Sequence, residues 1–128
     1  MSDNRETVIE EYGNDCRIVH EERNYPDLYH VLGSAGQMKS FENLHAARLY
    51  ADVYTILGGF DEKQTGKRGI PPAIARASEE LRMTYFAVQM SVTYAALAFE
   101  VDDLVIHDAI ERVHARAESQ RSLADNDA

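Results

Sequence analysis

Apolar residues recur every three or four positions between residues 71 and 100, and this period is typical of one face of a helix. Pro71 and Pro72 mark its start, because proline is accepted in a first turn and disfavours helix in the preceding residue. Residues 83–99 carry no charged side chain on any side. We therefore predict one long central helix over about 71–100, with its second half surrounded by other structure. Its apolar face consists of Ile74, Ala77, Leu81, Tyr85, Val88, Val92, Ala95 and Phe99.

Two shorter segments before the central helix are also expected to be helical. Residues 26–32 begin with a proline in their first turn and end at Gly33. Residues 41–57 have Ser40 in position to cap them and carry apolar stripes on two sides, which predicts two neighbouring elements. Both segments are expected to pack against the central helix.

One more helix is predicted near the end of the chain, over about 104–120. Asp102 and Asp103 are candidates to cap its N-terminus. No Gly or Pro separates it from the segment 71–100, so the sequence leaves open whether the two helices are continuous. Residues 121–128 form a polar tail.

The first 24 residues carry seven acids and three arginines but few large apolar side chains. Such a segment contributes little core of its own, so we predict an acidic arm over 1–24. Within it, residues 17–20 would pair as a short strand if a neighbour offers an edge. With a helical domain over 25–120 and the polar tail, the expected fold is all-α: a small helical bundle around one long central helix, with an N-terminal arm.

Length and charge narrow the classes of function. A chain of 128 residues with 45% hydrophobic side chains fits one domain with one core. The net charge of -9 argues against general affinity for phosphate backbones or anionic membrane surfaces, because clustered Lys and Arg hold both. We expect no sequence-specific nucleic-acid partner and no membrane. The uncharged run 83–99 is about as short as a membrane span can be and is diluted by polar residues, so we interpret it as a buried helix.

The residue usage also indicates a compartment. Three Lys and ten Arg stand against 22 acids, a balance that resembles halophilic proteins of salt-loving cytoplasms, although an ordinary acidic protein fits equally well. Cys16 is the only cysteine, so no disulfide framework exists and a reducing compartment is the default. The polar N-terminus lacks the apolar run of a signal peptide. We expect a protein that is cytoplasmic or assembled in a virion, and not secreted by a signal peptide.

Two Glu-x-x-His pairs place a carboxylate and an imidazole one helical turn apart, which is half of the ligand set of carboxylate-bridged di-iron bundles. The further inward Glu residues that such a site needs are missing from the uncharged half of the central helix. We therefore predict no metal and no cofactor. If a metal binds, its candidate ligands are Glu42, His45, Glu111 and His114.

Catalysis is not expected either. Cys16 lies beside Asp15 in an acidic segment, and nearby carboxylates raise the pKa of a thiol. The five histidines have no ordered acid partner in the sequence. We therefore predict no catalytic residue and no enzyme.

The only stretch with a net positive charge is the glycine-rich segment after residue 58. It lacks the spacing of a phosphate-binding P-loop, and no strand is expected before it. Its three cations, Lys63, Lys67 and Arg68, are candidates for a contact with an acidic partner.

Large apolar side chains surround the second half of the central helix, and only three short or medium helices are expected to cover them. Burying one such side chain is worth roughly 1.5–3 kcal/mol, so leaving several exposed would be costly. We therefore predict a homo-oligomer, or an assembly with other protein subunits. The expected interface residues are Tyr85, Phe86, Met90, Tyr94, Leu97 and Phe99.

Part of this pattern resembles the head-tail connector (adaptor) proteins of tailed viruses, in which a helix, a glycine-containing loop and a hydrophobic-Pro segment precede a long helix. The resemblance covers residues 44–88 and implies a ring subunit between portal and tail, without a catalytic step. The residues that carry it are Leu44, Ala47, Tyr54, Gly58, Gly59, Ile70, Pro71, Ile74, Ala77, Leu81 and Tyr85.

Two other functions stay open. A small acidic inhibitor or DNA mimic would use the carboxylates of the first 24 and last 28 residues as its binding face. A metal-binding or regulatory helical bundle is the third alternative. A structural or interaction protein without a catalytic step is the function that the sequence favours.

Overall fold

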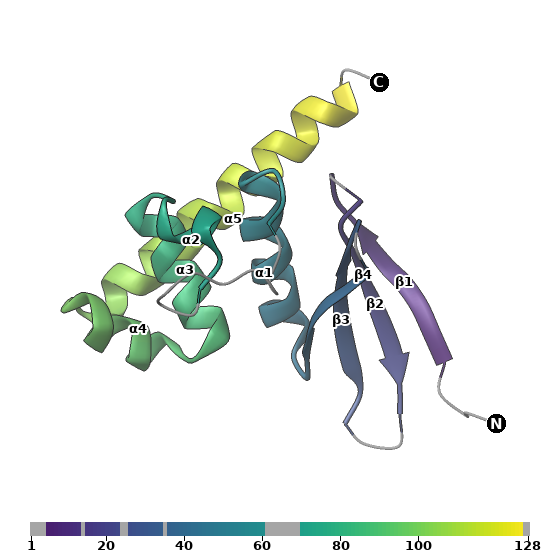
Figure 1. Ribbon diagram of the computed structural model, residues 1–128, viewed down its shortest axis with the longest axis horizontal. Coiled ribbons are helices and arrows are strands. Elements are labelled where there is room, and N and C mark those ends of the chain that lie inside the picture. Colours follow the sequence, from purple (N-terminus) through teal and green to yellow (C-terminus); the bar gives the residue numbers. More distant parts are fainter. Residues whose placement is uncertain (1–4, 14, 24–25, 35, 61–69, 127–128) are drawn as a thin grey trace.

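The computed structural model describes residues 5–13, 15–23, 26–34, 36–60 and 70–126, and these form a four-stranded antiparallel sheet and five helices (Figure 1). The strands pair in chain order as a meander. They are β1 (Arg5–Glu11), β2 (Arg17–Glu22), β3 (Leu28–Gly33) and β4 (Gly36–Phe41). The helices are α1 (Leu44–Ile56), α2 (Pro72–Ala75), α3 (Glu79–Gln89), α4 (Val92–Phe99) and α5 (Asp103–Asn126).

The fold is therefore α+β, and the prediction of an all-α bundle with an N-terminal arm is wrong. The segment predicted as an arm contributes β1 and β2, and the residues expected to pair if offered an edge lie in β2. The segment 26–32 is not a helix, because most of it lies in β3. Tyr29 and Val31 are residue types that favour strands, and the paired strands β2 and β4 supply the hydrogen bonds.

The sheet has one face toward the helices and one away from them. Ile18 and Val31 are opposite each other in the β2–β3 register, are fully buried and pack toward α1. Their neighbours Val19 and His30 are also opposite each other and therefore point to the other face. In Figure 1 the sheet stands on one side of α1, and α2, α3 and α4 stand on the other side.

The predicted central helix over 71–100 is also wrong, because this segment forms three separate helices. Two serines cap the starts of the new helices α3 and α4. Ser78 and Ser91 take extended backbone conformations, and their hydroxyls accept hydrogen bonds from the amides of Leu81 and Tyr94. A serine in this role satisfies an amide that a new helix leaves free, which favours a restart over a continuous helix.

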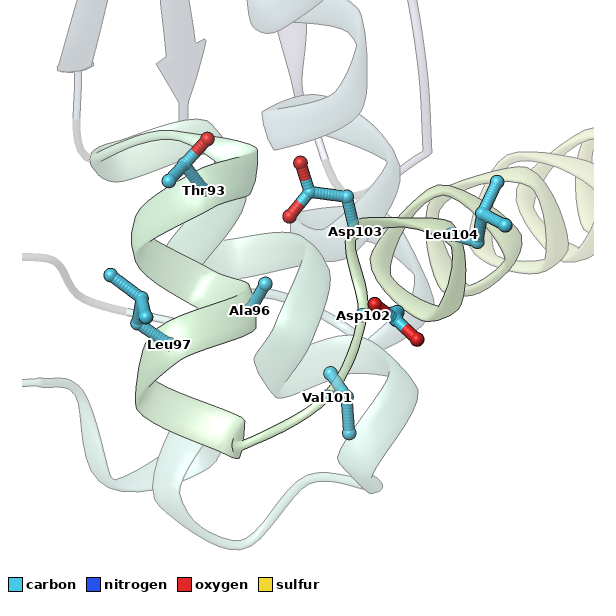
Figure 2. Close-up of a pocket in the computed structure, with 7 residues that line it drawn as sticks. All are labelled: Thr93, Ala96, Leu97, Val101, Asp102, Asp103 and Leu104. Carbon is cyan, nitrogen blue, oxygen red and sulfur yellow. The ribbon is translucent and has the colours of Figure 1, made fainter.

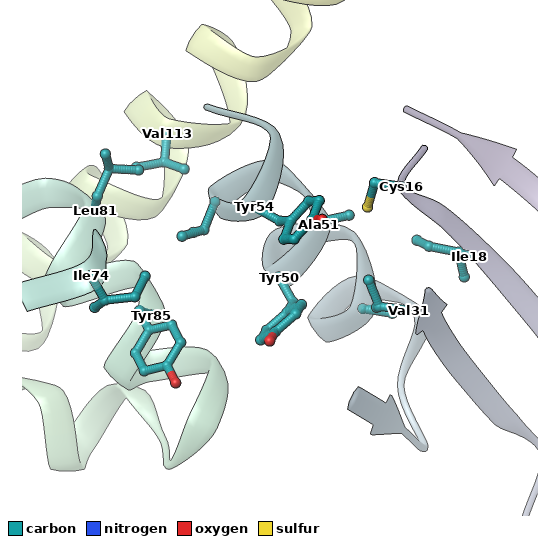
Figure 3. Packing of buried hydrophobic residues seen from close by; sticks show 12 residues of the cluster. Cys16, Ile18, Val31, Tyr50, Ala51, Tyr54, Ile74, Leu81, Tyr85 and Val113 are labelled. Atoms are coloured by element: carbon teal, nitrogen blue, oxygen red, sulfur yellow. The ribbon is translucent and has the colours of Figure 1, made fainter. Parts of the chain in front are cut away.

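These restarts let the uncharged segment cover part of itself. The larger hydrophobic cluster joins the sheet, α1 and α3 (Figure 3). The ring of Tyr50 packs there against the rings of Phe41, Phe60 and Tyr85. A smaller cluster lies among α3, α4 and α5, and it includes Met83, Ala95, Ala96, Ile106 and Ala109.

The other two predicted helices are present with shifted ends. Residues 41–57 contain α1, although Asn43 rather than Ser40 caps it. The helix predicted over 104–120 is α5, which runs on to Asn126. It is separate from α4, because Glu100 takes the left-handed conformation that ends a helix. Figure 1 shows α5 passing α4, α3 and α1 before its last turns extend beyond the helical layer.

Candidate interaction surface

Large apolar side chains are exposed on α4, in the turn before it, and at the start of α5. Leu97 and Leu104 are each 74% exposed and Met90, which follows α3, is 60% exposed. Tyr94 and Val105 are also exposed. We call these five side chains the corner surface. Leu97 and Leu104 line one hollow of about 370 Å³ together with Thr93, Ala96, Val101, Asp102 and Asp103 (Figure 2).

The corner surface exists because α4 presents its small residues to the interior. Ala95 and Ala96 are buried in the smaller hydrophobic cluster, whereas Tyr94 and Leu97 point away from it. Alanine at these inward positions lets α4 approach α3 and α5 closely. Tyr94 and Leu97 are consequently left in contact with water, whereas an ordinary surface helix turns such side chains toward the core.

The expected interface residues divide into two groups. Met90, Tyr94 and Leu97 lie on the corner surface. Tyr85 is buried in the larger cluster, and the rings of Phe86 and Phe99 pack edge-to-face at 5.8 Å inside the chain. The expected loop contacts Lys63, Lys67 and Arg68 lie outside the described residues.

The candidate metal ligands do not come together in the described part of the chain, where no group of three or more His, Cys, Asp or Glu side chains is arranged to hold a metal. Glu42 precedes α1 and is exposed. His45 lines a hollow of about 280 Å³ between α1, α3 and α5, and His107 lines the same hollow. Glu111 is exposed on α5.

His114 instead contacts an acid that the sequence did not single out. Its Nδ1 lies 2.9 Å from Oδ2 of Asp52, which is 1% exposed in the middle of α1. Its Nε2 lies 3.3 Å from Oε1 of Glu118. The second carboxylate oxygen of Asp52 is buried without a hydrogen-bond partner among the described residues. Burial raises the pKa of Asp52, and the hydrogen bond from His114 only partly opposes this.

Cys16 and Tyr12 lie near this buried carboxylate, and neither is activated. Burial, helped by the charge of Asp52, raises the pKa of the Cys16 thiol to about 12. Burial also raises the pKa of Tyr12, whose hydroxyl donates to Glu10 at 2.6 Å. A thiol with a raised pKa is a poor nucleophile, because the thiolate is the reactive form. Asp52 and His114 thus hold α1 to α5 rather than activate a neighbour.

Two further histidines pair with acids at the sheet. His20 Nε2 lies 3.0 Å from Oδ2 of Asp27, and its ring stacks on Tyr29. The hydrogen bonds that Asp27 accepts from the amide of Arg23 and from His20 lower its pKa. On the face away from α1, His30 Nε2 lies 2.7 Å from Oε1 of Glu21, and its Nδ1 lies 2.6 Å from Oγ of Ser40. The expectation that the histidines lack ordered acid partners does not hold for these residues.

Comparisons with protein families, curated proteins and solved structures find no match for the chain. No described helix combines the length and the apolar character that crossing a membrane requires. The virion and connector interpretation has no support from these comparisons. The predicted all-α fold is wrong, because the chain contains a sheet. The long helix of the connector interpretation is also wrong, because residues 70–88 contain the four-residue α2, a break, and α3.

Proposed function

We propose that the protein acts through protein–protein contacts and self-associates through the corner surface. The observation that carries this proposal is the orientation of α4, which buries alanines and exposes Tyr94 and Leu97. Burying a side chain as large as Leu97 or Leu104 is worth roughly 1.5–3 kcal/mol. Contiguous exposed apolar side chains with a polar rim mark interaction sites, and Met and Tyr are enriched in the centres of interfaces.

A second copy of the chain is the partner that we favour. Two corner surfaces in contact would cover the same apolar side chains on both subunits, as two-fold interfaces do. Asp102 and Asp103 border the shared hollow and are exposed, so they would lie at the rim of the contact. Their repulsion across the interface is screened by salt. We therefore expect association to strengthen as the salt concentration rises.

A pair of glutamate substitutions tests this proposal. Leu97→Glu adds a charge to the corner surface, whereas Val8→Glu adds the same charge to an exposed apolar position on β1. We expect Leu97→Glu to give a monomer in sedimentation velocity and Val8→Glu to sediment as the unaltered chain does. Circular dichroism should show unchanged helix content in both variants, because both positions are exposed.

If the Leu97→Glu variant sediments as the unaltered oligomer does, the contact between subunits lies on another surface of the molecule. A chain that is monomeric before any substitution would instead favour an acidic inhibitor or DNA mimic. For that alternative, exposed Glu6, Glu11, Asp108 and Glu111 on β1 and α5 offer carboxylates for a basic partner. Retention on an immobilised basic protein, with elution by salt, would then be the matching measurement.

A further inference from the structure

The outer face of the sheet carries three polar side chains that form a chain of contacts across neighbouring strands. Val19, His30 and Ser40 are partners in the registers of β2, β3 and β4, and Glu21 lies two residues along β2 from Val19 on the same face. Glu21 Oε1 lies 2.7 Å from His30 Nε2, and Ser40 Oγ lies 2.6 Å from His30 Nδ1. An acid, an imidazole and a hydroxyl are therefore connected in that order.

The chemistry of the acid fixes the tautomer of His30. An ionised carboxylate only accepts hydrogen bonds, so the neutral ring donates from Nε2 to Glu21. Nδ1 then carries a lone pair, and it accepts the hydrogen bond from the hydroxyl of Ser40. This is the arrangement in which a base oriented by an acid activates a serine for nucleophilic attack.

Burial separates the base from water and leaves the nucleophile accessible. The side chains of His30 and Glu21 are 10% and 14% exposed, whereas Ser40 is an exposed residue. An electrostatic interaction is stronger away from water, so Glu21 can stabilise the imidazolium that forms when His30 takes a proton. Ser40 is thus an exposed residue that a molecule approaching the outer face can meet.

A β-bulge adds a hydrogen-bond donor beside Ser40. The register pairs Val31 with Lys39 and Leu32 with Gln37, so Met38 is an extra residue in β4. In a regular strand, residues three apart lie on opposite faces, and the extra residue of the bulge brings the side chains of Gln37 and Ser40 to the same face. There, Gln37 Nε2 donates to Ser40 Oγ at 3.0 Å. An amide in this position can also reach the oxygen of a carbonyl group that the serine attacks.

His30 differs from the other acid-paired histidines among the described residues, because its second ring nitrogen contacts a hydroxyl. His114 has a carboxylate at each ring nitrogen, from Asp52 and Glu118. His20 has Asp27 at Nε2, and its ring stacks on Tyr29. Within the hydrogen bonds described above, only His30 joins an acid to a hydroxyl.

We infer that Ser40 is an activated nucleophile that is acylated by small carboxylic esters, with His30 as general base and Glu21 as the residue that positions it. Ser40 Oγ forms a bond to the ester carbonyl carbon while its proton passes to His30 Nδ1. The bond from that carbon to the alcohol oxygen then breaks, and Nδ1 returns the proton to the departing alcohol. Water attacks the acyl group in the same way, which releases the acid and restores the hydroxyl.

The surroundings of Ser40 indicate the class of substrate. The side-chain amide of Gln37, which donates to Ser40 Oγ, is the group that we assign to the developing oxyanion. Such limited stabilisation suits esters with good leaving groups better than amides. This activity goes beyond the proposed self-association and does not depend on it, since the outer face of the sheet and the corner surface belong to different elements.

Covalent labelling of the full chain tests this inference. We expect diisopropyl fluorophosphate to modify Ser40, as located by peptide mass mapping, and to leave Ser91 unmodified in the same molecule. Ser91 is the matched internal control, because it is exposed and its hydroxyl caps α4 without a histidine contact. With p-nitrophenyl acetate, the unaltered chain should release nitrophenol faster than the Ser40→Ala variant.

Two variants separate activation from exposure alone. His30→Gln removes the base, and we expect it to slow the labelling of Ser40 by about 100-fold, the lower end of what a positioned base contributes. Glu21→Gln should slow the labelling of Ser40 with no effect on that of Ser91, which a general loss of folding would not produce. Equal labelling of Ser40 and Ser91 in the unaltered chain, or unchanged labelling of Ser40 in a folded His30→Gln variant, would overturn the inference.

Discussion

The sheet half of the molecule and the helical corner use apolar side chains in opposite ways. Between the sheet and α1, large residues such as Tyr50, Ile18 and Val31 point inward and are fully buried. In the corner, α4 points Ala95 and Ala96 inward and leaves Leu97 among the most exposed of the large apolar residues described. The first arrangement buries large apolar side chains inside the chain, whereas the second leaves them exposed to water. Burial, rather than hydrophobic content, therefore decides which residues stabilise the fold and which are available for binding.

Two tyrosines give the largest expected contrast between these regions. Tyr50→Ala should lower the free energy of unfolding by about 3–5 kcal/mol, the range found when a large buried ring is removed. Tyr50 is buried, and its ring lies 5.7 Å from Phe41 and 5.9 Å from Phe60. Tyr94→Ala on the corner surface should change the stability of the monomer by about 0.5 kcal/mol or less. Urea unfolding at a dilute concentration measures both, and equal losses would contradict the contrast.

A glycine at the end of β3 gives an intermediate effect in the sheet half. A Cβ atom at Gly33 would lie 2.7 Å from the hydroxyl of Tyr54 and 2.9 Å from the sulfur of Met38. Gly33→Ala should therefore lower the free energy of unfolding by about 1–3 kcal/mol, the usual cost of overpacking. A Cβ at Gly13 meets nothing within 4 Å, so Gly13→Ala serves as the matched control. A Gly33→Ala variant as stable as this control would show that the β3–α1 contact is loosely packed.

Two aspartates should contribute to the pH dependence of stability with opposite signs. Burial raises the pKa of Asp52, so the folded chain retains a proton that the unfolded chain has already lost. The contribution of Asp52 is therefore most favourable below its unfolded pKa and is lost as the pH rises through its folded pKa. Hydrogen bonds lower the pKa of Asp27, so its contribution is present above the unfolded pKa and is lost as the pH falls.

The corresponding asparagine variants separate these two contributions. Relative to the unaltered chain, Asp52→Asn should gain stability as the pH rises from about 3 to about 7, and Asp27→Asn should lose stability over the same range. Thermal unfolding at several pH values measures both differences. The two curves should slope in opposite directions, and parallel curves would contradict the different environments of the two acids.

The sequence predicts the local features of the chain better than its long-range contacts. The helices at α1 and α5 follow from their apolar periodicity, although the cap predicted for α1, Ser40, is wrong. The breaks at Ser78 and Ser91 also had a signal, because each serine precedes an apolar helical run as a cap does. The sheet was missed, since its strands are short and a strand depends on hydrogen bonds from a neighbour that propensity alone does not identify.

The polar sites were beyond the reach of sequence for the same reason. Asp52 and His114 are 62 residues apart and meet only because α1 packs on α5. Glu21, His30 and Ser40 come together through the strand registers, which a shift of one residue would reverse. Met90, Tyr94 and Leu97, by contrast, were expected to be interface residues from their excess of apolar surface alone. That expectation stays a prediction until the oligomeric state is measured.

Sedimentation equilibrium of the unaltered chain over a dilution series tests the central claim most directly. We expect the weight-average mass to rise with concentration from 14.4 kDa toward an integer multiple of it, and to rise at lower concentrations when salt is added. A mass of 14.4 kDa at every concentration and salt condition would contradict self-association through the corner surface.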